Sequence, residues 1–345
     1  MIGLAATLYR TFYGSILSRL PEPTAIAAGQ AGLRALPLDR LPLFRSRDRR
    51  LAVTLGGVRL PNPLILSSMY YDPTILRRAM GLGFGAVTTK SITLDPRPGH
   101  PEPNLVRVRS GAGPGFVNCN GFKNPGLEAY RPLLPGIPHR VPLIVAVAGE
   151  SIDEYVTLVE RLAPYGDLVE FNISSPNTAL VYEWSRKPDE LRRLFRAARE
   201  ATRKPLIVKL SPDFADTNEA AIIPAALDAG VTIVNYGNTR RVVEPRLSQG
   251  AGGLSGPELY PATLANVRRT RARFGQALEI IATGGVDSPD KALALIRAGA
   301  SACAYFTGFI TRGPALARLI LDRLSRELDR TGSATVKALR ARDEG

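Results

Sequence analysis

Cysteine is scarce in this sequence, which contains only Cys119 and Cys303 among its 345 residues. Two thiols cannot form the set of disulfides that holds a small secreted domain together, so that class of protein is excluded. The two cysteines also lack the short ligand spacing of a zinc site, and we expect no metal. Reduced cysteines fit a cytoplasmic protein.

Long apolar runs are missing as well. The first twenty residues hold an apolar stretch that is too short to span a bilayer, and they lack the basic head and small-residue cleavage site of a signal peptide. Within this stretch, apolar side chains recur at the spacing of an amphipathic surface helix: Leu4, Leu8, Phe12, Ile16 and Leu20. A second helical stretch covers about Thr24 to Leu36. We expect the pair, residues 1–40, to contact a membrane surface; the alternative is a lid packed on the rest of the chain.

Acidic residues are outnumbered, with 31 Asp and Glu against 45 Lys and Arg, which gives a formal net charge of +14. Such an excess attracts anionic partners, nucleic acid among them. The basic residues are spread along the whole chain, however, and their local runs at Arg45–Arg50 and Arg268–Arg273 lack the interleaved aromatics that single-stranded binding requires. We therefore interpret them as a solvated surface and expect no nucleic-acid partner.

Hydrophobic residues make up 45% of the chain, enough for a large core, and 345 residues allow either two domains or one barrel with an extension. Prolines and charges over Pro37–Arg50 predict a linker after the first helices. The rest, residues 41–345, alternates helical stretches with eight short apolar runs, which we expect to be strands: Leu64–Ser67, Ala86–Lys90, Leu143–Val147, Leu168–Asn172, Leu206–Leu210, Val231–Tyr236, Glu279–Thr283 and Ala302–Phe306.

Helix starts between these runs support the alternation. Ser151 with Glu154 three residues later forms a capping box, and Ser288 followed by Pro289 supplies an N-cap and a first-turn proline. Eight strands joined by helices predict an α/β fold, a (β/α)8 TIM barrel with an N-terminal helical extension. An open doubly wound sheet is the alternative, although no Gly-x-Gly-x-x-Gly follows the first strand.

In such a barrel, chemistry is located where the strands end. The residues that close the predicted strands are mostly polar or glycine: Ser67, Ser68, Lys90, Ser91, Asn172 to Thr178, Lys209, Asn238, Thr239, Gly284, Gly285, Thr307 and Gly308. Glycines after strands seven and eight, with Gly252–Gly256 after strand six, allow backbone N–H groups to bind an anion, so we expect a phosphate-bearing ligand. Lys90 and Lys209 end apolar strands, where an ammonium group needs a negative partner unless it reaches the barrel rim. The Asn172–Thr178 loop offers amides suited to a planar ring and a serine that can accept a proton.

Five segments together resemble the dihydroorotate dehydrogenase family. The block from Phe171 to Thr178 is similar to the signature of that family, and the similarity extends in order from Leu51 to Ile320 through four supporting segments: Val117–Gly126, Val208–Asp213, Gly252–Gly256 and Ala298–Pro314. The resemblance implies a (β/α)8 barrel that binds FMN and oxidises dihydroorotate to orotate in pyrimidine biosynthesis.

Roles follow from the matching positions. Ser175 is expected to be the base that removes the C5 proton of dihydroorotate, with Phe122 and Thr178 in its proton relay. The resemblance assigns two sets of binding residues. Those for the substrate are Lys90, Asn118, Asn172, Asn177, Asn238 and Thr239. Those for FMN are Ser67, Ser68, Lys90, Ser91, Asn172, Lys209, Ser255, Gly256, Gly284, Gly285, Thr307 and Gly308.

The pattern mixes two classes of the family. A serine base and N-terminal helices resemble class 2, which reduces quinone and lies peripherally on the inner face of the cell membrane. The lysine that class 2 carries after strand one is replaced here by Ser67–Pro73, whereas Thr89–Ser91 resembles class 1, whose substrate lysine follows strand two. Val145–Gly149 also lacks a class 2 asparagine, and 179–186 departs from the usual sequence. We expect quinone as the acceptor.

Three other functions fit parts of the pattern. A related FMN enzyme could act on another dihydropyrimidine or use a different acceptor, because Tyr70, Tyr71 and Trp184 offer an altered pocket. A tRNA dihydrouridine synthase would share barrel, flavin and basic charge, but it carries a cysteine acid and an appended RNA-binding domain. A non-catalytic phosphate-binding barrel would not need polar residues at nearly every strand end.

Overall fold

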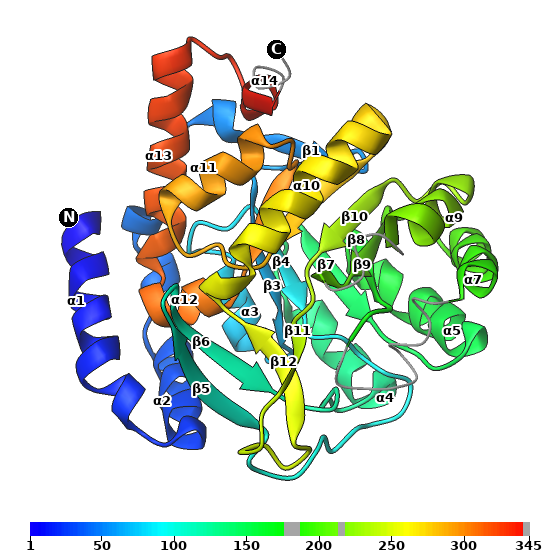
Figure 1. Cartoon of the computed structure of the whole chain (residues 1–345), viewed down its shortest axis with the longest axis horizontal. Coiled ribbons are helices and arrows are strands. Elements are labelled where there is room, and N and C mark those ends of the chain that lie inside the picture. Colours follow the sequence, from blue (N-terminus) through cyan, green and yellow to red (C-terminus); the bar gives the residue numbers. More distant parts are fainter. Residues whose placement is uncertain (176–186, 213–217, 341–345) are drawn as a thin grey trace.

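The computed structural model of the chain describes residues 1–175, 187–212 and 218–340 (Figure 1). Eight parallel strands close into a barrel in the order β10-β13-β14-β3-β4-β7-β8-β9. Their bounds are β3 Leu64–Tyr70, β4 Ala86–Thr89, β7 Leu143–Val147, β8 Leu168–Asn172, β9 Leu206–Leu210, β10 Ile233–Tyr236, β13 Glu279–Thr283 and β14 Ala302–Tyr305. The predicted (β/α)8 class is confirmed, and the open-sheet alternative is wrong because β10 hydrogen-bonds to both β9 and β13.

Strand bounds differ from the prediction at four places, and two of the differences are small: β4 ends at Thr89 and β14 at Tyr305, each one residue earlier than predicted. The strand β3 continues past Ser67 to Tyr70, because its pairing with β4 shifts register between Leu66 and Tyr70. The strand β10 begins at Ile233 rather than Val231. The longer β3 carries Ser67 and Ser68 into the mouth of the barrel.

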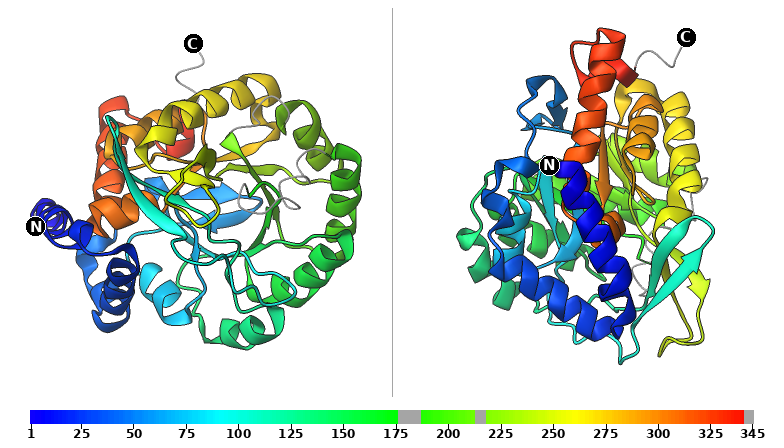
Figure 2. Two further views of the ribbon diagram at one scale, coloured as in Figure 1. Left: turned by 60° about the horizontal axis from the view of Figure 1, so that its bottom comes forward. Right: turned by 90° about the vertical axis from the view of Figure 1, so that its left-hand side faces the viewer.

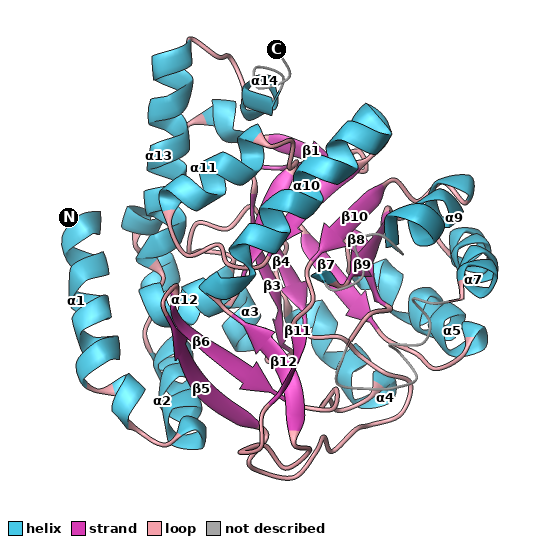
Figure 3. Ribbon diagram, viewed as in Figure 1, coloured by secondary structure: helices cyan, strands magenta, loops and turns pink. Residues whose placement is uncertain are grey.

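Helices surround the barrel (Figure 3). Apolar side chains between helices and strands form its main core. The α-helices of the barrel region are α3 Pro73–Ala79, α4 Leu127–Tyr130, α5 Ile152–Leu162, α7 Pro188–Ala201, α9 Ile223–Asp228, α10 Tyr260–Phe274, α11 Pro289–Arg297, α12 Thr307–Arg312, α13 Ala315–Thr331 and α14 Val336–Arg340. Short 3-10 turns occur at Arg131–Gly136, Ala163–Tyr165, Pro257–Leu259 and Gly275–Ala277, and a π turn at Asn218–Ile222. Both predicted N-caps are confirmed, since Ser151 Oγ accepts from Glu154 N and Ser288 Oγ from Lys291 N.

A second sheet lies over one end of the barrel and was not predicted. It contains β5 Leu105–Ser110, β6 Gly113–Asn118, β11 Arg240–Val243 and β12 Ala251–Ser255, paired antiparallel in the order β11-β12-β6-β5 (Figure 2). Its two halves come from the segments that follow β4 and β10, so the sheet stands at the carboxyl ends of the barrel strands. A smaller hairpin, β1 Val53–Leu55 with β2 Val58–Leu60, precedes the barrel.

Two N-terminal helices pack on the outside of the barrel. The first, α1 (Ile2–Ser15), is followed by a 3-10 turn at Leu17–Arg19 and contacts α12 and α13; the second, α2 (Glu22–Ala35), contacts α3 and β5 (Figure 2). Tyr9 Oη donates a hydrogen bond of 2.8 Å to the Ile310 carbonyl, and the Arg107 guanidinium donates to the carbonyls of Leu17 and Leu20. The helices are therefore anchored to the barrel rather than tethered loosely to it.

The segment predicted as a linker forms three 3-10 turns, at Leu38–Arg40, Pro42–Phe44 and Arg49–Leu51. Asp39 and Phe44 within it are buried, and Arg78 and Arg140 both form ion pairs with the Asp39 carboxylate, at 2.6 and 3.1 Å. These contacts hold the N-terminal helices in a fixed position relative to the barrel.

Candidate functional site

A chain of polar side chains crosses the barrel interior just below the strand ends. Lys209 Nζ donates to Ser68 Oγ at 2.8 Å and lies 3.4 Å from Glu170 Oε1. Asn235 Nδ2 donates to Glu170 Oε2 at 2.6 Å, and Thr283 Oγ1 donates to Asn235 Oδ1 at 2.7 Å. Five strands thus contribute one residue each to a connected, buried network.

Three members of this network were missed from sequence: Thr283, which ends β13, and Glu170 and Asn235. Glu170 and Asn235 lie inside strands that otherwise read as apolar, and the prediction considered only the residues that close each strand. The signal was present: an acid in a strand buried on both faces needs a polar partner inside the barrel.

A second group of amides and hydroxyls lies one layer nearer the strand ends. Asn172 Nδ2 donates to Ser91 Oγ at 3.0 Å, while Asn238 Nδ2 donates to Asn172 Oδ1 at 3.1 Å and to Ser174 Oγ at 3.3 Å. The backbone N–H of Thr239 donates to Asn238 Oδ1. Residues at or after the ends of β4, β8 and β10, which are alternate strands of the barrel, are thereby joined.

Ser175 directly follows this group and is buried, with 6% of its surface exposed. Asn177, Thr178 and Trp184 lie outside the described residues. Phe122 is buried and adopts a left-handed backbone conformation with φ 55°, uncommon for an aromatic residue. Its carbonyl accepts from Asn124 Nδ2 at 2.6 Å, and Asn124 also donates to Thr93 Oγ1. Asn124 therefore fixes the loop that carries Phe122.

Asn118 belongs to the antiparallel sheet that covers the carboxyl ends of the barrel strands. It ends β6, and its Nδ2 donates to the Gly253 carbonyl of β12 at 3.3 Å. Glycine is needed here because a Cβ on Gly253 would lie 1.9 Å from Thr239 Oγ1 and one on Gly252 would lie 2.6 Å from the Asn118 carbonyl. The close approach of these strands brings Asn118 and Thr239 to the same end of the barrel.

Lys90 follows β4, and its ammonium lies 5.9 Å from the centre of the Tyr71 ring. Burial, reinforced by the nearby charge of Lys123, lowers the Lys90 pKa from 10.5 to about 8. A lysine in this state gains from an anionic ligand, because the ligand would offset both effects.

Glycine turns follow the strands β12 and β13. Gly256, Gly284 and Gly285 all have positive φ, at 124°, 122° and 74°. A Cβ on Gly285 would lie 2.5 Å from the Tyr260 nitrogen, so the turn closes tightly on the start of α10. Beside these turns, Thr307 Oγ1 donates to Ser255 Oγ at 3.1 Å, and Gly308 is buried in α12. Backbone and hydroxyl donors gather here as a phosphate would require.

Ser67 indicates independently that this end of the barrel suits a polar ligand. Its Oγ is buried and has no hydrogen-bond partner among the described residues. A buried hydroxyl without a partner is costly, so a polar ligand at the end of β3 would relieve it. The free hydroxyl, the glycine turns and the buried lysines fit a ligand with both a polar ring and a phosphate.

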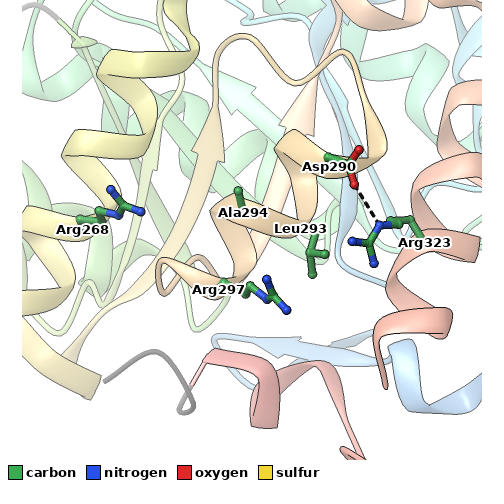
Figure 4. Close-up of a pocket in the computed structure, with 6 residues that line it drawn as sticks. All are labelled: Arg268, Asp290, Leu293, Ala294, Arg297 and Arg323. Atoms are coloured by element: carbon green, nitrogen blue, oxygen red, sulfur yellow. Dashed lines mark hydrogen bonds and ion pairs between the residues drawn. The ribbon is translucent and has the colours of Figure 1, made fainter. Parts of the chain in front are cut away.

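Two other features lie away from this end. A cavity of about 280 Å³ sits among α10, α11 and α13 and is lined by Arg268, Asp290, Leu293, Ala294, Arg297 and Arg323 (Figure 4). Arg323 is paired with Asp290 and Glu327, and Arg297 with Glu327, so most of its charge is already offset. Within the described ranges, no cluster of three or more His, Cys, Asp or Glu could hold a metal ion.

Residues 50–328 match the family model described as dihydroorotate dehydrogenase. The chain belongs to the dihydroorotate dehydrogenase family. A quinone-type dihydroorotate dehydrogenase of Erythrobacter litoralis is 33% identical over 90% of this chain and 93% of its own length. The catalytic subunit of the NAD(+)-type dihydroorotate dehydrogenase B of Pyrococcus abyssi is also 33% identical, over 84% of this chain and 97% of its own.

A solved dihydroorotate dehydrogenase of Eimeria tenella in complex with ferulenol superposes with a TM-score of 0.80 at 25% identity, covering 93% of this chain and 95% of that one. Family and fold are thus fixed, and both agree with the resemblance found in the sequence. Relatives with two different electron acceptors match equally well, so family membership leaves the acceptor open.

Proposed function

We propose that the protein oxidises dihydroorotate to orotate in pyrimidine biosynthesis, with FMN as its cofactor and quinone as its electron acceptor. The observation that carries the proposal is the position of Ser175. It is buried and directly follows Ser174, whose hydroxyl donates to the Lys209 carbonyl and accepts from Asn238, and Asn238 is in turn hydrogen-bonded to Asn172. A proton acceptor, planar hydrogen-bonding groups and a buried cation are the parts that oxidation of a dihydropyrimidine ring requires.

The residues fit FMN. Ser255, Gly256, Gly284, Gly285, Thr307 and Gly308 would hold its phosphate, and Ser67, Ser68, Lys90, Ser91, Asn172 and Lys209 would surround its ring system. The unsatisfied Ser67 hydroxyl and the positive-φ glycines support this assignment. When bound, FMN supplies the acceptor for the hydride that leaves C6 of the substrate.

The protein's own groups handle the substrate and its proton. Asn118, Asn172, Asn238 and Thr239, with Asn177 outside the described residues, bind the edges of the pyrimidine ring, and Lys90 binds its carboxylate. Ser175 removes the C5 proton, which then leaves by way of the Thr178 hydroxyl, and Phe122 serves this relay as an apolar residue that takes up no proton itself. Burial of Ser175 keeps water away from the reacting carbon.

Anaerobic reduction tests this proposal. Purified protein should carry FMN and be yellow, and dihydroorotate should bleach its absorbance near the visible flavin maximum. Protein that carries FMN but stays yellow with dihydroorotate, while another dihydropyrimidine bleaches it, would reassign the substrate. Colourless protein that does not take up added FMN would refute the proposal.

Quinone as the acceptor is supported by α1. One stripe of α1, formed by Ile2, Ala6, Tyr9 and Tyr13, faces the barrel, whereas a second apolar stripe beside it is exposed: Leu4 at 65%, Leu8 at 62%, Phe12 at 45% and Ile16, directly after the helix, at 49%. Such a surface suits an apolar environment, and it supports the proposed peripheral position of the protein on the inner face of the cell membrane. No helix within the described ranges is long and apolar enough to cross a membrane.

A further inference from the structure

Glu170 is a buried acid to which the proposed reaction assigns no task. Its side chain is 2% exposed and its partner Lys209 is 8% exposed, so both charges lie in the barrel interior. Removing two charges from water costs more than their attraction returns unless the geometry is well made, and a pair of neutral residues can serve a core equally well. The pair therefore calls for a functional reason.

The strand register places Glu170 beneath Lys209. Asn172 of β8 pairs with Lys209 of β9, while Glu170, two residues earlier on the same face, pairs with Ile207. The Lys209 ammonium thus extends over the carboxylate from the layer nearer the strand ends. Ligands reach the barrel from those ends, so Glu170 contacts the lysine from the side opposite the site.

The carboxylate is held in place on both oxygens. Oε1 faces Lys209, Oε2 accepts from Asn235 at 2.6 Å, and Asn235 is fixed in turn by Thr283. An ammonium has three donors. Among the described residues, Glu170 and Ser68 are the side-chain partners of Lys209, which leaves one donor for a ligand.

We propose that Glu170 is a positioning residue that sets the reduction potential of the bound flavin through Lys209. It holds the ammonium at a fixed place in the barrel interior and offsets part of its positive charge. A cation beside the ring favours the reduced, negatively charged cofactor, and a carboxylate 3.4 Å from that cation weakens the preference. This inference rests on the proposed FMN.

The variant Glu170→Gln tests the proposal, because it keeps size and polarity and removes the charge. With that charge gone, we expect the flavin midpoint potential to rise by about 30 mV or more, which for a two-electron couple corresponds to a tenfold stronger preference for the reduced form. Glu170→Asp retains the charge at a greater distance and should give a smaller rise. Should Glu170→Gln fail to fold, Glu170→Asp decides the question.

A double-mutant cycle with Lys209→Met shows whether the effect passes through the lysine. In the Lys209→Met background, Glu170→Gln should no longer raise the potential. Glu327→Gln is the matched control: Glu327 is equally buried and paired with arginines on the outer helices, and its loss should leave the potential unchanged.

Two results are distinguishable. Wild-type protein that binds no flavin refutes the proposed function itself. The role given to Glu170 is overturned by either of two results in protein that binds flavin. One is a wild-type flavin potential in the Glu170 variants, and the other is a rise in potential in Glu170→Gln that persists when Lys209 is replaced by Met.

Discussion

Ser175 is buried after β8, and its hydroxyl is the group that we expect to accept the substrate proton. Ser175→Ala should slow dihydroorotate-dependent flavin reduction by about 100- to 10,000-fold, the usual effect of removing a general base. Stopped-flow absorbance measures this rate. Orotate should still perturb the flavin spectrum, because the asparagines remain, and Ser175→Cys should recover part of the rate. A loss below fivefold in Ser175→Ala would assign the base elsewhere.

Lys90 should give the reaction a pH dependence. Burial and then the charge of Lys123 lower its pKa to about 8, so the ammonium is charged below that pH and becomes neutral above it. Only the charged form attracts the substrate carboxylate. We expect kcat/KM to fall about tenfold per pH unit above pH 8, since this ratio reports groups of the free enzyme.

Lys123→Gln is the control for this assignment, because Lys123 is exposed and its charge acts on Lys90 from a distance. The alkaline fall in kcat/KM should move to higher pH in this variant. It should disappear in Lys90→Met, whose kcat/KM should be low at every pH. An unchanged profile in both variants would exclude Lys90 as the titrating group.

Most site residues at or next to strand ends were found from sequence, whereas Glu170 and Asn235, inside strands, were missed. Once eight strands were assigned, the position of Lys209 or Asn238 followed from the barrel alone. Glu170 and Asn235 are single polar residues within apolar runs. Nothing near them in the sequence indicates their hydrogen-bond partners, which lie on other strands 39 to 65 positions away along the chain. Only the closed barrel brings these residues together.

Among the elements, the antiparallel sheet was not predicted from sequence, and its glycines are the reason. The strands β6 and β12 are rich in glycine, with Gly113, Gly115, Gly252 and Gly253, and glycine normally argues against a strand. Here the glycines allow close backbone approach: a Cβ on Gly115 would lie 2.5 Å from the Ser255 carbonyl. The same residues that weaken the sequence pattern make the sheet possible.

The exposed stripe of α1 carries a prediction of its own. Leu8→Glu should reduce binding to lipid vesicles about tenfold or more, because a fully buried leucine contributes about 1.5–3 kcal/mol and each 1.4 kcal/mol is a factor of ten. Thr7→Glu adds the same charge at a neighbouring exposed position that is already polar. Co-sedimentation with vesicles and quinone reduction measure the effect.

Flavin reduction by dihydroorotate should be equal in Leu8→Glu, Thr7→Glu and the wild type, because α1 packs on α12 and α13 through its other face. Equal quinone reduction in all three proteins would mean that the stripe has no part in delivering the acceptor. The anchoring of α1 by Tyr9 and of its following turn by Arg107 would then be structural only.

At the scale of the whole molecule, the site joins distant parts of the chain. Ser67 on β3, Gly285 after β13 and Ser255 on β12, which is bonded to Thr307 after β14, all lie toward the carboxyl ends of the barrel strands, so a ligand that touches all three links the barrel with the antiparallel sheet. A ligand that binds only the folded state stabilises it, by about 2.7 kcal/mol at a hundred times its Kd. Removal of FMN should therefore lower the melting temperature by several degrees, about 2–4 °C for each kcal/mol in large domains.

Riboflavin separates the contribution of the phosphate from that of the ring. It carries the same ring system, so it can satisfy Ser67 and Lys209, but it has no group for the glycine turns at Gly256 and Gly285. Added to the apoprotein at equal concentration, FMN should restore the melting temperature fully and riboflavin only in part. Equal recovery would show that the turns bind no phosphate. If neither compound restored the melting temperature, the Ser67 hydroxyl would have to bind a ligand other than a flavin. A flavin that does not stabilise the protein does not bind the folded state more tightly than the unfolded state.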